Sequence, residues 1–156
     1  MTQVETADLR PGHRISRVIK GGWQLAGDHG SVEREAAIAV MEAFLDAGIT
    51  TFDCADIYTG VEEMIGSFIE DVRKRRGAEV AERAVVHTKL VPDLSRLADI
   101  RPNEVEAIVD RSLMRLKIDR LHLVQFFWWD LSIGDAVSAF EVLKRCQEKG
   151  KIGSLG

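Results

Sequence analysis

The stretch ITTFDCADIYTGVEEMIGSFIEDV, from Ile49 to Val72, contains two patterns that follow each other without a break. Its first part is a short apolar run that is typical of a buried strand and ends at Asp53. Its second part repeats apolar residues at the i, i+3, i+4, i+7 spacing of a helix, with Gly77 as the expected stop: Val61, Met64, Ile65, Phe68, Ile69 and Val72. The stretch therefore predicts a strand followed by an amphipathic helix.

The same alternation continues on both sides of this stretch. Further apolar runs with strand character are RVIKGGWQL (17–25), RAVVHTKL (83–90), LHLVQFFW (121–128) and KIGSLG (151–156). Helical periodicity returns at 31–47, where Ser31 is the expected N-cap, and again at 103–117 and 135–148. Strands that alternate with helices in units of roughly 30 residues predict parallel strands joined by right-handed crossovers.

Two architectures fit this order of elements: a small doubly wound sheet of five strands, or part of a (β/α)8 barrel. The fifth run, KIGSLG, has no helix after it in the 156 residues, whereas a doubly wound domain would normally carry one. We therefore expect a single domain, residues 1–156, that forms an incomplete (β/α)8 barrel of about five parallel strands alternating with four helices. Arg10-Pro11-Gly12 predicts a turn after a short polar arm.

Composition narrows the class of protein. Of the residues, 46% are hydrophobic and 29% charged, and the net charge is −4, which gives no electrostatic reason to expect nucleic acid or a membrane surface as partner. The basic run 73–76 is expected to be a solvated helix end. Two cysteines, with neither a signal-type segment nor an apolar run of membrane-spanning length, predict a cytoplasmic protein.

Polar side chains with chemical potential follow several of the predicted strands. Asp53 ends the second strand, Tyr58, the single tyrosine, lies in the loop after it, and Lys89 ends the third. In either architecture these positions share the working edge of the sheet. An ammonium beside a phenol favours its ionised form, and a carboxylate would hold that ammonium in place. This combination suits a tyrosine that acts as general acid toward a carbonyl oxygen.

The motifs themselves resemble the aldo-keto reductase family over nearly the whole chain and in the family's order. FDCADIYTGVEEMIG has the family's Asp, with Ala two residues and Tyr five residues after it, and VVHTKL is similar to its lysine segment. SLMRLKIDRLHLVQFFWW, RVIKGGWQLAG and GKIGSLG are similar to the remaining strands of the N-terminal half of that barrel.

The resemblance implies roles for individual residues. Tyr58 matches the general acid, and Lys89 and Asp53 match the residues that tune it. Gly22, Trp23 and Asp53 match positions near the nicotinamide of NADP(H). Trp23, Phe127 and Trp128 match the substrate pocket. The implied reaction is NADPH-dependent reduction of an aldehyde or ketone, a small-molecule carbonyl substrate, to an alcohol.

Two departures from the family accompany this resemblance. Phe127 occupies the position of a family histidine that donates a hydrogen bond to the carbonyl oxygen, so it is either a core aromatic or the wall of a pocket reshaped for an apolar substrate. His87 and His122 are poor replacements, because neither is expected at the same depth on its strand. The second departure is length: five strands leave sheet edges open, and we expect self-association of the chain or marginal stability.

Two other sites are not expected. The four histidines and two cysteines lack the close spacing of zinc ligands, so no metal site is predicted. The loop GDHGS, Gly27 to Ser31, lacks the glycine spacing and lysine of a phosphate-binding motif and is interpreted as a loop with an N-cap. The alternative to a reductase is a non-catalytic binding or regulatory protein, or a fragment that keeps the scaffold.

Overall fold

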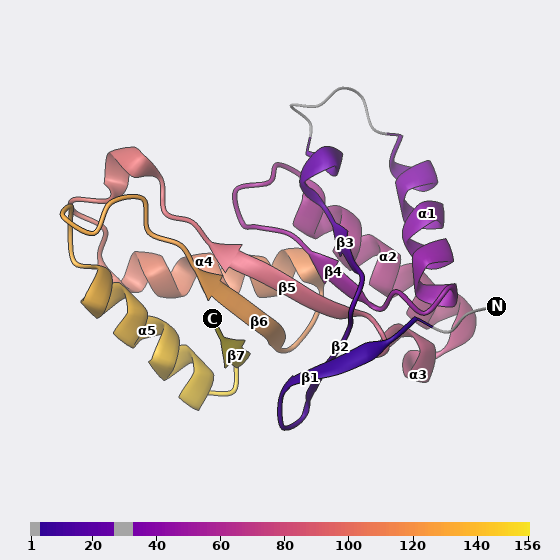
Figure 1. The fold of residues 1–156 in the computed structure, drawn as a ribbon. Coiled ribbons are helices and arrows are strands. Elements are labelled where there is room, and N and C mark those ends of the chain that lie inside the picture. Colours follow the sequence, from indigo (N-terminus) through magenta and orange to yellow (C-terminus); the bar gives the residue numbers. More distant parts are fainter. Residues whose placement is uncertain (1–3, 27–32) are drawn as a thin grey trace.

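The computed structural model of the chain describes residues 4–26 and 33–156 (Figure 1). Its main feature is a five-stranded parallel sheet whose strands are adjacent in sequence order: β3 (Ile19–Gly21), β4 (Thr51–Asp53), β5 (Val85–Leu90), β6 (Leu121–Phe126) and β7 (Ile152–Leu155). Each strand lies inside one of the predicted apolar runs. In a doubly wound sheet the order of the strands reverses at a switch point. The order of the strands here follows the sequence without a reversal, as in part of a barrel, and this confirms the incomplete (β/α)8 architecture.

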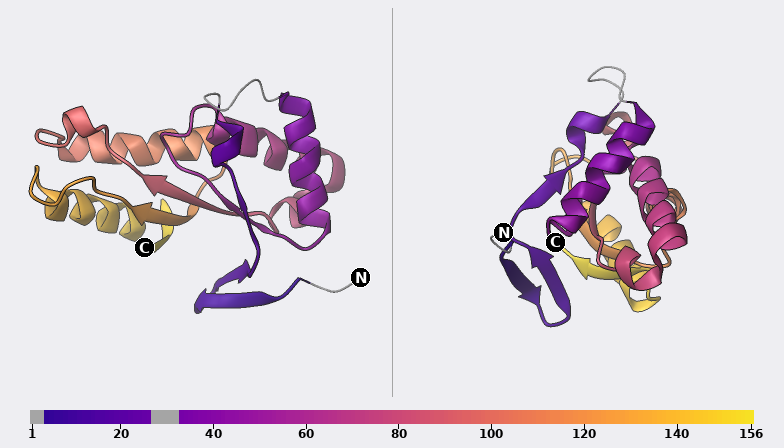
Figure 2. Two further views of the ribbon diagram at one scale, coloured as in Figure 1. Left: turned by 45° about the horizontal axis from the view of Figure 1, so that its top comes forward. Right: turned by 90° about the vertical axis from the view of Figure 1, so that its right-hand side faces the viewer.

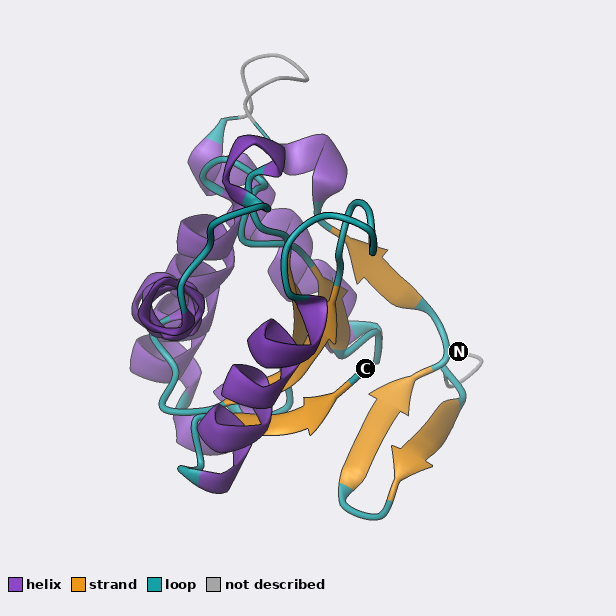
Figure 3. Cartoon of the chain, turned by 90° about the vertical axis from the view of Figure 1, so that its left-hand side faces the viewer, coloured by secondary structure: helices purple, strands orange, loops and turns teal. Residues whose placement is uncertain are grey.

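The helices cover one face of this sheet (Figure 3). They are α1 (Arg34–Asp46), α2 (Val61–Arg76), α4 (Pro102–Leu116) and α5 (Ala136–Glu148), together with the one-turn α3 (Ala78–Ala81) and the short 3-10 turns η1 (Trp23–Leu25) and η3 (Leu94–Arg96). The four long helices match the four predicted ones. The single turn α3, which is too short to give a periodic signal, is additional.

Helix boundaries follow local capping chemistry. The carboxylate of Glu33 accepts the backbone N–H groups of Glu35 and Ala36 and so caps α1, whereas the expected cap, Ser31, lies outside the described residues, as does the GDHGS loop. Gly77 follows α2 with φ +94°, a conformation that suits glycine. The basic run 73–76 forms the last turn of α2, where Arg75 and Arg76 pair with acidic residues.

An N-terminal hairpin is the element that the sequence did not predict. Strands β1 (Thr6–Arg10) and β2 (His13–Ser16) pair antiparallel around the turn at Pro11-Gly12, where Gly12 has φ +78° (Figure 2). The turn was expected, but the strands were not, because residues 6–10 are polar or exposed and show no apolar alternation. The hairpin lies against the sheet at the amino ends of the strands, on the side away from the helices (Figure 3).

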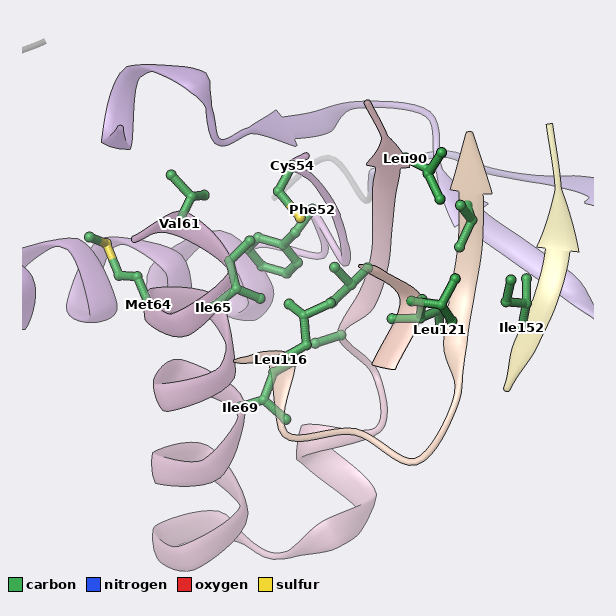
Figure 4. Packing of buried hydrophobic residues seen from close by; sticks show 14 of the residues in the cluster. Phe52, Cys54, Val61, Met64, Ile65, Ile69, Leu90, Leu116, Leu121 and Ile152 are labelled. Atoms are coloured by element: carbon green, nitrogen blue, oxygen red, sulfur yellow. The ribbon is translucent and has the colours of Figure 1, made fainter. Parts of the chain in front are cut away.

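The hydrophobic core fills the space between sheet and helices (Figure 4). Phe52 of β4 packs on Phe68 of α2 with ring centroids 5.2 Å apart, and both rings are fully buried. Helices α2 and α4 approach so closely at Gly66 that a Cβ there would lie 2.2 Å from the carbonyl oxygen of Arg115. No helix among the described residues is long and apolar enough to cross a membrane.

Candidate active site

Asp53 and Lys89 are in direct contact at the carboxyl edge of the sheet. The register pairs Asp53 with His87, so Lys89 lies two residues further along β5, on the same face of that strand. Its Nζ is 2.6 Å from Oδ2 of Asp53 and donates a second hydrogen bond, of 2.8 Å, to the backbone oxygen of Cys54. The side chain of Lys89 is 23% exposed and that of Asp53 is 30% exposed, so a ligand at this edge of the sheet can reach the ion pair.

Tyr58 reaches the same place from the loop between β4 and α2. Two backbone bonds shape that loop: Tyr58 N–H donates to the oxygen of Ala55, and Val61 N–H donates to the oxygen of Tyr58. Gly60, with φ +78°, turns the chain into α2. The ammonium of Lys89 lies 5.4 Å from the centre of the Tyr58 ring. The three predicted catalytic residues therefore lie together, although they come from two different β–α units.

Gly22 and Trp23 form the lip on the β3 side of this edge. Gly22 N–H donates to the backbone oxygen of Asp53 at 2.7 Å, and a Cβ on Gly22 would lie 2.9 Å from that oxygen and 2.9 Å from the side chain of Val61. Only glycine allows this approach. Trp23, the next residue, begins η1 and keeps 55% of its surface exposed.

The aromatic residues after β6 separate into two groups. Phe127 is 43% exposed, and its ring meets that of Trp129 edge-on at 4.9 Å, while the indole N–H of Trp129 donates to the oxygen of Pro92. Trp128 instead stacks on Phe126, which itself contacts Phe140 of α5, and its indole N–H donates to the oxygen of Ile133. Trp128 thus packs toward the helix layer, and its predicted contact with substrate stays a prediction.

His13 and His122 lie toward the amino ends of the strands, whereas His87 is next to Asp53 in the strand register, two residues before Lys89. His87 is buried below Lys89, and burial, together with His13, lowers the pKa of His87 to about 4. His122 accepts the backbone N–H of Val86 through Nδ1, and burial likewise lowers its pKa to about 4. Among the described residues, no group of three potential metal ligands occurs.

One ionisable residue near the site was not predicted from the sequence. Asp56, two residues before Tyr58, is 6% exposed and accepts the N–H of Val91 at 2.9 Å, with Arg111 3.7 Å from its other oxygen. Burial raises the pKa of its carboxyl to about 6. An aspartate three residues after a strand-end aspartate carries no signal of its own in the sequence, because only the fold of the loop buries it.

The model of the aldo/keto reductase family matches residues 17–156 of the chain. The chain belongs to this family. The family match covers all five strands of the parallel sheet and both residues of the Lys89–Asp53 pair. The hairpin strands β1 and β2 precede the matched segment.

Known proteins resemble the chain over almost all of its length. It is 31% identical over 153 residues to 6-dehydroglucose reductase of Novosphingobium aromaticivorans and 29% identical over 165 residues to the uncharacterized oxidoreductase YrpG of Bacillus subtilis, each covering 93% of the chain. These alignments cover 48% and 47% of the two proteins. The chain spans about half the length of the curated relatives it matches.

Solved aldo-keto reductases share the fold. One from Klebsiella pneumoniae, in complex with NADPH, has a TM-score of 0.74 at 23% identity, covering 98% of this chain and 49% of that one. The holo form of another, from Bacillus halodurans, has a TM-score of 0.75 at 19% identity, covering 98% and 50%. At these identities the likeness supports the fold, and the chain corresponds to about half of each solved chain.

Proposed function

We propose that the chain carries the catalytic half of a reductase that converts an aldehyde or ketone to an alcohol with NADPH as the hydride donor. The single observation that carries the proposal is the joint placement of Tyr58, Lys89 and Asp53 at one edge of the sheet. In this proposal Tyr58 is the general acid and gives its hydroxyl proton to the carbonyl oxygen. NADPH, when bound, supplies the hydride that is added to the carbonyl carbon.

Lys89 and Asp53 have distinct tasks in this scheme. The positive charge of Lys89 next to the ring favours the phenolate that Tyr58 becomes after it has given up its proton. Oδ2 of Asp53, 2.6 Å from Nζ, holds the ammonium in place, and the Cys54 carbonyl accepts a second of its three N–H groups. The third N–H of Lys89 is then left for the phenol side of the site.

The residues at the lip fit the nicotinamide end of the cofactor. Trp23 is half exposed at the same edge of the sheet as Asp53. Gly22 has no side chain, and this allows the end of β3 to approach the end of β4 closely. A flat ring could lie on the exposed indole, as aromatic stacking prefers. We propose Gly22, Trp23 and Asp53 as the residues that hold this end. The pyrophosphate and adenine parts are assigned no residues of this chain, so NADPH is expected to bind weakly here.

Phe127 alters the proposed chemistry. A phenylalanine donates no hydrogen bond, so the carbonyl oxygen would meet Tyr58 alone. Loss of one donor to a developing oxyanion typically costs roughly 100- to 1000-fold in rate. With Trp23 and Phe127 both exposed, the pocket offers apolar walls, which favours an apolar or aromatic carbonyl compound.

The proposal is tested by titrating the 156-residue chain with NADPH and following tryptophan fluorescence. Saturable quenching at any concentration up to millimolar NADPH supports it, and it should be lost in Trp23→Phe but kept in Trp129→Phe, whose indole is held at Pro92. Active preparations should lose carbonyl reduction in Tyr58→Phe with NADPH binding intact. Absence of saturation up to millimolar NADPH would contradict the proposal for this chain and assign the reaction to a longer protein.

A second candidate is a binding or regulatory protein that keeps the scaffold without turnover. Phe127 in the place of the family's histidine favours it. Under this alternative, ligands bind at the edge formed by Lys89 and Asp53, but Tyr58→Phe changes no rate. Single-turnover measurements with NADPH and an aromatic aldehyde separate the two, because a catalytic chain oxidises bound NADPH and a binding protein leaves it unchanged.

A further inference from the structure

A second cleft lies at the opposite end of the sheet from Lys89 and Asp53. It has a volume of about 330 Å³ and is enclosed by the hairpin turn and by the residues that begin β5, β6 and β7. Its polar walls are Arg10, His13, Arg14, Arg120, His122 and Ser154. The proposed reductase chemistry uses none of these residues.

The charge around this cleft is strongly positive in a chain whose net charge is −4. Of its three arginines, only Arg14 has a carboxylate partner within the described part of the chain: Asp8, at 3.2 Å. Arg10 and Arg120 lie within 4 Å of no carboxylate oxygen in residues 4–26 and 33–156. Both arginines also affect neighbouring histidines. Burial and, to a smaller extent, the charge of Arg10 lower the pKa of His13. Burial lowers the pKa of His122, with smaller effects from His13 and Arg120. Two guanidinium groups are thus without a counter-charge.

The histidines supply a rigid wall with an available donor. The N–H of Val86 can only donate, so Nδ1 of His122 must accept, and the neutral ring carries its proton on Nε2. His13, 7% exposed, is held from both sides: its Nδ1 is 2.8 Å from Oγ of Ser154 and its Nε2 is 3.0 Å from Nε2 of His87. This network ties the hairpin to β5 and β7 and so holds the turn over the cleft.

We propose that this cleft binds a small phosphate dianion, either inorganic phosphate or the phosphate group of a small phosphorylated metabolite. Arg10 and Arg120 provide two sets of paired N–H donors that match the oxygens of such an anion, and Nε2–H of His122 provides a neutral donor. Two unpaired positive charges favour a dianion over a monocarboxylate. The small volume and the negative net charge of the chain disfavour a nucleic acid strand.

The test uses the 156-residue chain at pH 8, where phosphate is mostly dianionic, with ionic strength held constant by chloride. Binding of inorganic phosphate is followed by calorimetry and by the side-chain NMR signals of the histidines. Saturable binding is expected, with shifts at His13 and His122. Arg10→Gln and Arg120→Gln should each weaken it about tenfold, as loss of a charge-assisted hydrogen bond does.

Arg101→Gln is the matched control, because it removes the same charge from a well-exposed side chain at the start of α4, outside the cleft. It should leave phosphate affinity unchanged. Binding that never saturates, or that weakens equally in all three variants, would show a non-specific effect of charge and overturn the proposal. A parallel titration with glycerol phosphate identifies the source: tighter binding than inorganic phosphate indicates a phosphorylated metabolite, and exclusion of the ester indicates the free ion.

Discussion

Lys89 and Asp53 lie 36 residues apart in the chain, yet Nζ and Oδ2 are 2.6 Å apart. This contact depends on the parallel register of β4 and β5, which pairs Asp53 with His87 and leaves Lys89 two residues beyond it. It needs no residue outside these two β–α units. The proposed proton-transfer group is therefore complete within half of a barrel, whereas Trp23, Phe127 and Trp129 are exposed to solvent.

Replacing either member of this pair should affect chemistry more than stability. Asp53→Asn and Lys89→Met should each lower carbonyl reduction by about 100-fold or more, because Tyr58 loses its charged neighbour or that neighbour loses its anchor. Both side chains are partly exposed, so the free energy of unfolding should fall by less than about 1 kcal/mol. Single-turnover rates and urea unfolding measure the two effects. Asp93→Asn, on the exposed rim, is the control, and an equal loss of rate there would contradict the assignment.

Phe127→His should raise the rate of carbonyl reduction. The substitution returns a hydrogen-bond donor to the end of β6, where the ring is 43% exposed and touches Trp129. One added donor at a developing oxyanion supports an increase of roughly 100-fold. The rate of NADPH oxidation with an aromatic aldehyde measures this. Phe127→Leu is the control, because it replaces the ring by a smaller apolar side chain without adding a hydrogen-bond donor. A histidine variant no faster than the leucine variant would mean that residue 127 does not contact the carbonyl oxygen.

Sequence patterns predicted the strands, the long helices and the residues of the proposed catalytic group, because each depends on short-range periodicity or on a family motif. The hairpin β1–β2 was not predictable in this way, since its first strand is exposed and polar and is held by long-range contacts of His13 with Ser154 and His87. The same reason applies to Asp56, whose pKa is set by burial in a folded loop. Trp128 shows a further limit. Trp128 packs on Phe126 and Trp129 packs on Phe127, but four consecutive aromatic residues have no polar–apolar alternation that would show which of them faces the helices.

Gly22→Ala should destabilise the fold, and Gly21→Ala should not. A Cβ on Gly22 would lie 2.9 Å from the Asp53 oxygen and from Val61, and relief of that overlap has to separate β3 from β4, at about 1–3 kcal/mol. A Cβ on Gly21 meets no atom of the described chain within 4 Å. Urea midpoints of the two variants provide the comparison. Equal midpoints would show that the lip adjusts freely to the added methyl group.

Stability should fall between pH 6.5 and pH 4, and Asp56 should moderate the fall. His87 and His122 have a folded pKa of about 4, below the unfolded value of about 6.5, so the unfolded chain binds more protons in this window and their contribution is lost as the pH drops. Asp56 acts in the opposite direction, because its folded pKa of about 6 lies above the unfolded value of about 3.9.

Asp56→Asn removes the opposing contribution and should make the acid-induced loss steeper by about 1–3 kcal/mol between pH 7 and pH 4.5. At pH 7 the variant should be as stable as the wild type or slightly more stable, since a buried charge is gone and the amide oxygen can still accept the N–H of Val91. Urea unfolding at several pH values measures both. Asp99→Asn, which is well exposed, should follow the wild-type curve. Parallel curves for Asp56→Asn and the wild type would refute the assigned pKa.

The open edge of the sheet should make the chain associate with itself. Among the described strands β3 and β7 each have one neighbour, and Ile19 of β3 keeps 42% of its surface exposed. Unpaired strand edges with apolar side chains favour pairing between chains.

Ile19→Lys should lower the apparent mass in light scattering, because a charge on an edge strand opposes that pairing. Leu131, in the loop after β6, is 79% exposed, and Leu131→Lys should leave the mass unchanged. If the wild-type chain is already a monomer that unfolds cooperatively on heating, the edge is protected without a partner, and the two variants will differ only in stability.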